Sequence, residues 1–72
     1  MKGGQMNSKK LTAGERLRNL RGTRSQEEVA EALGISQSAL STYENDERIP
    51  RDRIKVKIAD FYKRSVQFIF FN

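Results

Sequence analysis

Apolar residues recur at intervals of three and four positions along most of the chain, a spacing typical of helices that bury one face. Leu17 and Leu20 indicate a first helix, which is expected to begin at Thr12 and to end at Gly22. Thr12 and Glu15 have the spacing of a capping box, in which the hydroxyl and the carboxylate each accept a backbone N–H. This helix therefore has both a start signal and a stop signal.

A second helix is predicted to begin at Ser25, because Ser25 and Glu28 repeat the capping-box spacing. Val29 and Leu33 mark its buried side. Gly34 follows directly and is expected to adopt the left-handed conformation that ends many helices.

A third helix is predicted from Ser36 to about Asn45. Ile35 precedes the cap and Leu40 lies four residues inside the helix, which is the placement of a hydrophobic staple. Tyr43 is expected to face inward with Leu40.

A fourth helix is predicted from about Arg51 to Phe61 or Tyr62. The segment 53–58 also alternates between polar and apolar residues like a strand, but a lone strand would have no pairing partner. Ser65 is expected to cap a short fifth helix over 66–70. Residues 1–10 show no periodicity and are interpreted as a disordered lead-in, so residues 11–72 form an all-α, compact five-helix domain. The predicted core is Leu17, Leu20, Val29, Leu33, Leu40, Ile54, Ile58 and Phe61.

Composition excludes most catalytic chemistry. The 72 residues include no Cys and no His, so the usual nucleophiles, general bases and transition-metal ligands are missing. We therefore expect no enzyme activity, no metal, no other cofactor and no small-molecule substrate. No apolar run is long enough to cross a membrane, and the absence of Cys fits a reducing cytoplasm, where we place the protein.

The charge is unevenly distributed along the chain. The net charge of +5 arises from two basic ends, because residues 1–24 carry seven basic residues and 48–72 carry another seven. The intervening residues 25–47 carry six acidic residues and no basic ones, and the stretch 36–43 has no charge. This pattern suits an acidic partner such as nucleic acid without proving one.

The second and third helices have the spacing of a helix-turn-helix, over about 25–45. Ala30 precedes Gly34 by four residues, where a larger side chain would strike the next helix, and Leu40 follows Gly34 by six and fills the gap between the helices. Each residue is common alone. Together, between two capped helices, these residues specifically indicate a helix-turn-helix.

From about Leu11 to Phe71 the chain resembles the lambda-repressor-like family, the Cro/cI-type (XRE) DNA-binding domains. The matching segments are Glu15-Arg16-Leu17-Arg18, Ser25-Gln26-Glu27-Glu28-Val29-Ala30, Leu33-Gly34-Ile35-Ser36, Tyr43-Glu44-Asn45, Arg48-Ile49-Pro50, Ile58-Ala59 and Ser65-Val66. The resemblance implies a transcription regulator, expected to be a repressor, whose third helix reads double-stranded DNA. Two positions depart from the family pattern: the turn 21–24 is short, and Asp46 stands where glycine is usual.

The outward positions of the third helix are neutral and form hydrogen bonds, which suits base edges in the major groove. Gln37 is the candidate for a bidentate contact with adenine, and Ser38 and Thr42 are further base-contacting candidates. The alternative is an ordinary solvated helix face.

Candidate phosphate contacts surround these positions. Gln26 lies in the first turn of the second helix, where free N–H groups favour a phosphate. The full predicted phosphate set is Gln26, Ser36, Ser41, Asn45, Arg48 and Arg24. The resemblance further implies a structural pair between Arg21 and Glu44.

Two other functions remain open at this stage. One is a protein-interaction or antitoxin-like module that uses the same fold, although a partner-binding helix would more often present large apolar residues. The other is an element at a membrane surface, suggested by the basic, aromatic segment 51–71. Asp52, Asp60 and Gln67 argue against the membrane reading, because they leave no wide apolar face.

The C-terminal aromatic residues predict self-association. Three of the four Phe residues lie among the last five positions, and Val66, Ile69 and Phe70 can close the core. Phe68 and Phe71 then point elsewhere, and an exposed pair of large apolar side chains predicts a homodimer interface. The alternative is that one folds back onto the first helix and the other frays.

Overall fold

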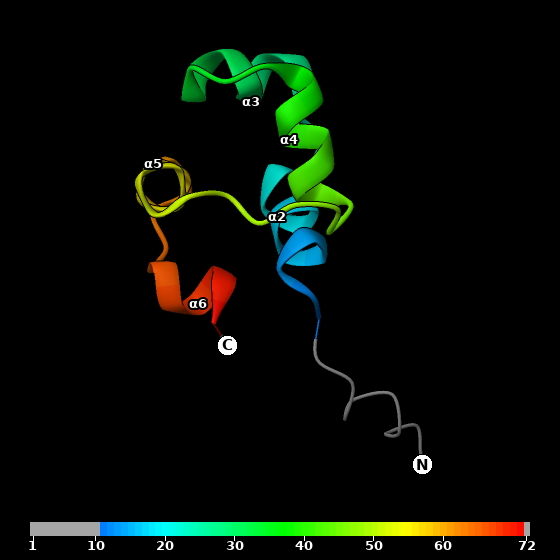
Figure 1. Ribbon diagram of the computed structural model, residues 1–72. Helices are drawn as coiled ribbons and strands as arrows, with labels where there is room; N and C mark the ends of the chain where they lie inside the picture. Colours follow the sequence, from blue (N-terminus) through cyan, green and yellow to red (C-terminus); the bar gives the residue numbers. More distant parts are fainter. Residues whose placement is uncertain (1–10, 72) are drawn as a thin grey trace.

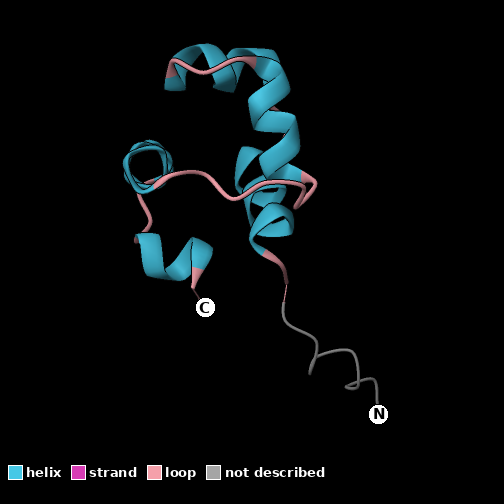
Figure 2. Ribbon diagram, in the orientation of Figure 1, coloured by secondary structure: helices cyan, strands magenta, loops and turns pink. Residues whose placement is uncertain are grey.

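The computed structural model describes residues 11–71, and within that part every regular element is a helix (Figure 2). The helices are α2 (Ala13–Arg21), α3 (Gln26–Leu33), α4 (Gln37–Glu44), α5 (Asp52–Tyr62) and α6 (Val66–Phe70). The predicted all-α, five-helix architecture is therefore confirmed, including a helix where residues 53–58 also resembled a strand. The disordered lead-in predicted for residues 1–10 lies outside the described residues.

The helices surround one core. α3 and α4 meet at an angle at the top of Figure 1, α2 lies beside α4, and α5 and α6 lie across from them. α6 packs on both α5 and α2, and a hydrogen bond of 3.0 Å from the Arg16 guanidinium to the Ile69 carbonyl joins α2 to α6. Among the described residues, no helix is long and apolar enough to cross a membrane.

The four predicted serine and threonine caps all form. Thr12 and Glu15 make the complete reciprocal box, and the hydroxyl of Ser36 accepts a bond from the third residue of its helix, as that of Ser65 does. Ser25 differs from the prediction, because among the described bonds its hydroxyl accepts from the Glu28 N–H without the return bond from the Glu28 carboxylate. One half of that box is enough to satisfy one free N–H of α3.

The core forms where the apolar pattern predicted it, but its members differ in how completely they are buried. Its fully buried members include Leu17, Val29, Leu40, Ile58 and Ile69. Other predicted members (Leu20, Ile54 and Phe61) are partly buried and pack against this cluster. Val66 and Phe70 do the same from α6, so the short last helix closes the core as predicted.

The turn between α3 and α4 has the expected geometry. Gly34 adopts the left-handed conformation with φ of 74°, and its N–H bonds back to α3. Ile35 then packs against the core before Ser36 starts α4. α3 and α4 are thereby held as a compact pair, which fixes the outward face of α4.

Candidate nucleic-acid interface

A polar groove runs along the outward face of α4. Its volume is about 490 Å³, and its lining residues are Gln26, Gln37, Ser38, Ser41, Thr42, Asn45 and Glu47. Six of these seven are residues that the sequence predicted to touch DNA. α4 supplies four of them, because Gln37, Ser38, Ser41 and Thr42 share the side of the helix opposite the buried Leu40.

Three predicted contact residues lie outside this groove. Ser36 precedes α4, and its hydroxyl accepts a hydrogen bond from the Ala39 N–H at 3.0 Å. Arg48 lies on the α4–α5 loop and lines two neighbouring hollows instead. Arg24 lies in the α2–α3 turn, where its guanidinium contacts two carbonyls of α2 and two aromatic rings of α5. The structure thus gathers most of the predicted set and leaves these three at its margins.

A buried carboxylate stands behind the groove. Glu44 at the end of α4 is 1% exposed, and both of its oxygens accept from Arg21, at 2.8 Å from Nε and 3.0 Å from Nη2. This hydrogen bond raises the pKa of Arg21 above its ordinary value, so the guanidinium stays charged. The bidentate geometry confirms the Arg21–Glu44 contact that the resemblance implied, and it ties α2 to α4.

The same carboxylate orients two glutamines. Gln26 Nε2 donates to Glu44 Oε1 at 2.9 Å, which leaves Gln26 Oε1 facing the groove. Gln37 Nε2 donates to Gln26 Oε1 at 3.4 Å. Gln37, which lines the groove, therefore has one amide hydrogen and its carbonyl oxygen free.

Arg18 holds the far end of the groove and was not identified from the sequence. Its Nη2 donates to the Glu44 carbonyl at 2.9 Å and to Asn45 Oδ1 at 3.0 Å. Because this bond occupies the Asn45 oxygen, the Asn45 amide nitrogen points toward Ser41, 3.4 Å from its Oγ. Only the fold brings Arg18 and Asn45 together, since they are 27 positions apart.

Arg24 packs on aromatic rings. Its guanidinium lies 5.3 Å from the Phe61 ring centroid and 5.5 Å from that of Tyr62, and it donates to the carbonyls of Leu20 and Arg21. A guanidinium over an aromatic face is attracted by the ring's electrons. This arrangement attaches the α2–α3 turn to α5.

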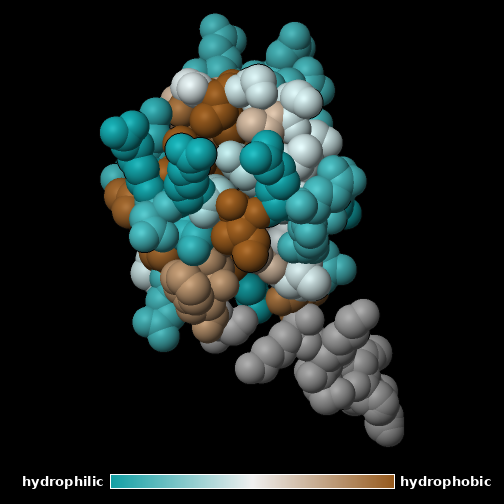
Figure 3. Space-filling model, in the orientation of Figure 1, coloured by the Kyte–Doolittle hydropathy of each residue, from teal (hydrophilic) through white to brown (hydrophobic). Residues whose placement is uncertain are grey.

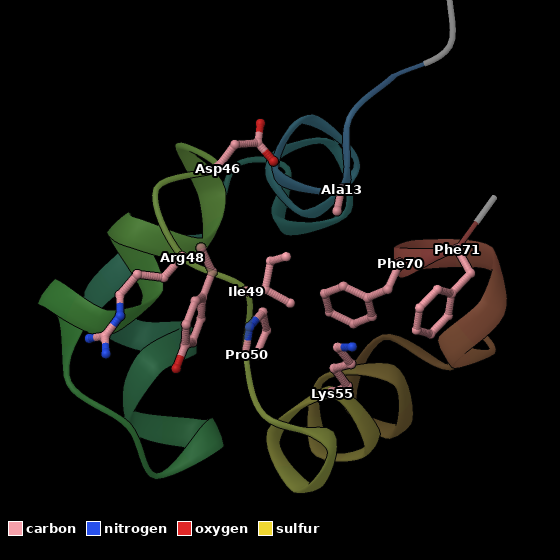
Figure 4. Close-up of a pocket in the computed structure, with 9 residues that line it drawn as sticks. Ala13, Asp46, Arg48, Ile49, Pro50, Lys55, Phe70 and Phe71 are labelled. Atoms are coloured by element: carbon pink, nitrogen blue, oxygen red, sulfur yellow. The ribbon is translucent and has the colours of Figure 1, made fainter.

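A second, more apolar hollow lies on the other side of the α4–α5 loop. It has a volume of about 260 Å³, and we call it the apolar cleft; its lining residues are Ala13, Tyr43, Asp46, Arg48, Ile49, Pro50, Lys55, Phe70 and Phe71 (Figure 4). Ile49 is 80% exposed and Phe71 64% exposed. In Figure 3 apolar side chains lie on this surface, over the loop and α6, between hydrophilic ones.

The two predicted interface phenylalanines are both exposed, and each has a different neighbour. Phe68 is 43% exposed and its ring lies 5.7 Å from the Arg64 guanidinium. The Phe71 ring lies 4.6 Å from Lys55 Nζ, which also faces Phe70 at 5.7 Å. Of the two, Phe71 lines the apolar cleft.

Comparison with known proteins agrees with this geometry. A family model described as helix-turn-helix matches residues 15–69, which is most of the chain. Among solved structures, the chain is similar to the P22 c2 repressor protein, crystallised in complex with a synthetic operator. The TM-score is 0.81 and the identity 22%, over 86% of this chain and 97% of that one, a likeness that shows the fold. Among curated proteins, no sequence matches the chain. The family match establishes that the chain belongs to the helix-turn-helix family, and the likeness in structure shows that it has the fold of the P22 c2 repressor protein.

Proposed function

We propose that the protein is a sequence-specific regulator that binds an operator in double-stranded DNA with α4 in the major groove, and that it acts as a repressor. The observation that carries this proposal is the polar groove. Neutral hydrogen-bonding side chains line it along one side of α4, and a buried ion pair supports it from behind. An α-helix fits the major groove of B-DNA, and neutral amides and hydroxyls match the donors and acceptors of base edges.

Gln37 is the proposed reader of an adenine. One hydrogen of the Gln37 amide is already donated to Gln26. The remaining N–H of Gln37 can donate to adenine N7 while the Gln37 amide oxygen accepts from adenine N6. Because Gln26 is itself held by Glu44, the Gln37 side chain is oriented before DNA arrives. Orientation in advance reduces the entropy lost on binding.

Thr42 and Ser38 are the other proposed base contacts. The Thr42 hydroxyl donates to the Ala39 carbonyl at 2.7 Å, so its proton is occupied and its methyl group and remaining lone pair are available. We propose that this methyl contacts a thymine methyl. Ser38 is exposed on the same face, and its hydroxyl is free to rotate as donor or acceptor.

The proposed phosphate contacts flank these residues. Asn45 has its oxygen occupied by Arg18, which leaves amide donors for a phosphate oxygen. The other members of the set are Gln26, Ser36, Ser41 and Arg48. We leave Arg24 out of the proposed phosphate set, because its guanidinium already contacts two carbonyls of α2 and two aromatic rings of α5.

We further propose that the regulator binds as a homodimer through the surface that carries the apolar cleft, with Phe71 and Phe68 in the interface. Exposed large apolar side chains favour association, and Ile49 adds exposed apolar surface to the cleft that Phe71 lines. Two copies related by a two-fold axis would read half-sites about 10 base pairs apart. Such a bacterial or phage regulator would act in the cytoplasm, where its DNA is.

Selection of bound sequences from a random double-stranded DNA pool tests this function. We expect enrichment of an inverted repeat with a conserved adenine in each half-site. Pools selected by the parent and by a Gln37→Ala variant should differ at that adenine. Failure to enrich any sequence would contradict the proposal and favour a protein-interaction or antitoxin-like role.

A further inference from the structure

The polar groove contains one charged residue, and that residue is acidic. Of the seven side chains that line the groove, Glu47 alone carries a charge, while the other six are neutral amides and hydroxyls. Glu47 follows α4 by three residues. Its N–H and that of Arg48 both bond to the Thr42 carbonyl, at 2.9 and 3.3 Å, which attaches this part of the loop to α4.

The Glu47 carboxylate has no protein partner among the described residues. It is exposed, and the ion pairs within the described chain involve other acids, namely Glu44 and Asp52. Its neighbour Asp46 differs, because that carboxylate bonds to Thr12 and to the Gly14 N–H at the start of α2. Glu47 therefore faces the groove with all of its acceptor capacity free.

A free carboxylate is unfavourable beside DNA unless it meets a donor. Phosphates repel it, and this repulsion lowers affinity for every sequence alike. In the major groove, guanine presents only acceptors and thymine an acceptor and a methyl group. Adenine presents its N6 donor next to the N7 acceptor. Cytosine presents an N4 amino donor without that neighbouring acceptor, and it is the base edge that an acceptor-only group matches.

We propose that Glu47 is a specificity residue that accepts a hydrogen bond from the N4 amino group of a cytosine in the operator. This inference rests on the proposed function, because it requires the polar groove to face DNA. α4 has eight residues and is about 12 Å long, which corresponds to three or four base pairs. Glu47 lies beyond the C-terminal end of α4 and Gln37 at its N-terminal end. The cytosine is therefore expected about three or four pairs from the adenine that Gln37 reads.

Selection from random DNA by four proteins at one fixed salt concentration tests the proposal. The proteins are the parent, Glu47→Ala, Glu47→Gln and the control Glu31→Gln, which removes the same charge from an exposed position of α3 outside the groove. The parent should enrich a cytosine that Glu47→Ala no longer selects, with about 5- to 150-fold of discrimination lost. Glu47→Gln should shift that position toward adenine, because an amide matches N6 and N7. Glu31→Gln should leave the selected sequence unchanged.

Two results would overturn the proposal, and they differ from each other. If both Glu47 variants select the parent's sequence and bind every DNA more tightly by one common factor, Glu47 contributes charge alone. If the parent enriches no sequence, the proposed DNA-binding function fails and this inference fails with it. The melting temperatures of all four proteins should agree within a few degrees, because the Glu47 and Glu31 side chains make no described bonds. Altered folding then cannot account for either result.

Discussion

The carboxylate of Asp46 accepts a hydrogen bond of 2.9 Å from the backbone N–H of Gly14, 32 positions earlier in the chain. Its other oxygen accepts from the Thr12 hydroxyl at 2.6 Å. Asp46 itself has φ of 60°, in the left-handed region where the family usually has glycine. Asp46, two residues beyond the end of α4, therefore acts as a second cap for α2, and this bond offsets the strain of a non-glycine residue there.

Substitutions at Asp46 should separate the cap from the strain. Asp46→Ala removes the cap and keeps the strain that the parent already has, so we expect a loss of about 1 kcal/mol, the usual contribution of a cap. Asp46→Gly removes both the cap and the strain and should be the milder change. Urea unfolding of the three proteins checks this order. An alanine variant as stable as the parent would show that the cap contributes nothing.

Gly14 should tolerate substitution less well than Gly34. A Cβ at Gly14 would lie 2.3 Å from the Glu44 carbonyl oxygen, so α2 and α4 would have to move apart. A Cβ at Gly34 would meet, among residues 11–71 and apart from its own chain neighbours, the end of the flexible Lys57 side chain at 3.3 Å. A side chain at Gly34 therefore meets no crowding between α3 and α4, and the left-handed strain remains.

We expect Gly34→Ala to cost about 1–2 kcal/mol, the usual penalty for the left-handed conformation. Gly14→Ala should cost more, although helix propensity alone would make alanine about 1 kcal/mol better than glycine inside a helix. Thermal melts compare the two. A Gly14→Ala protein as stable as the parent would mean that the α2–α4 contact is looser than described.

The caps were predictable from the sequence because a cap depends on neighbours within one helical turn. Thr12, Ser36 and Ser65 confirm this, and the pairing of Ala30 with Gly34 placed the turn for the same reason. The missed contacts join residues far apart in sequence, as Asp46 with Gly14, Arg18 with Asn45 and Arg24 with the rings of α5. No spacing rule relates such positions. Glu47 was missed because its place in the polar groove depends on how the loop bends back onto Thr42.

Gln37 and Arg48 should affect binding in opposite ways. Gln37→Ala should cost about 1–3 kcal/mol on the best site and relax one base position, with little change in the dependence of affinity on salt. Arg48→Ala should weaken binding to all sequences alike and lower the log–log salt slope by about one, as expected when one phosphate contact is lost. Titrations at several salt concentrations measure both. Equal salt slopes for Arg48→Ala and the parent would remove Arg48 from the phosphate set.

Tyr62→Phe should stabilise the protein and flatten its response to alkali. The Tyr62 hydroxyl is buried without a hydrogen-bond partner among the described residues, and leaving such a group unsatisfied costs about 1–3 kcal/mol. Burial also raises the pKa of Tyr62, with the Arg24 charge opposing the shift. The unfolded chain thus releases this proton at lower pH than the folded one, so stability is retained below pH of about 10 and falls as pH rises beyond it. Melts at neutral pH and above pH 10 should show a larger alkaline loss for the parent than for Tyr62→Phe; parallel losses would place the titrating group elsewhere.

The dimer interface should depend more on Phe71 than on Phe68. Phe71 is the more exposed of the two and lines the apolar cleft with Ile49, whereas the Phe68 ring faces Arg64 and does not line the cleft. Burying a large apolar side chain contributes roughly 1.5–3 kcal/mol and each subunit loses one, so Phe71→Ser should raise the dimer dissociation constant by at least about 10-fold in sedimentation equilibrium. Phe68→Ser serves as the matched control with a smaller effect, and the double variant should be a folded monomer that binds the full operator weakly. If the parent sediments as a monomer at high micromolar concentration and still binds one half-site at a time on the operator, this interface does not exist.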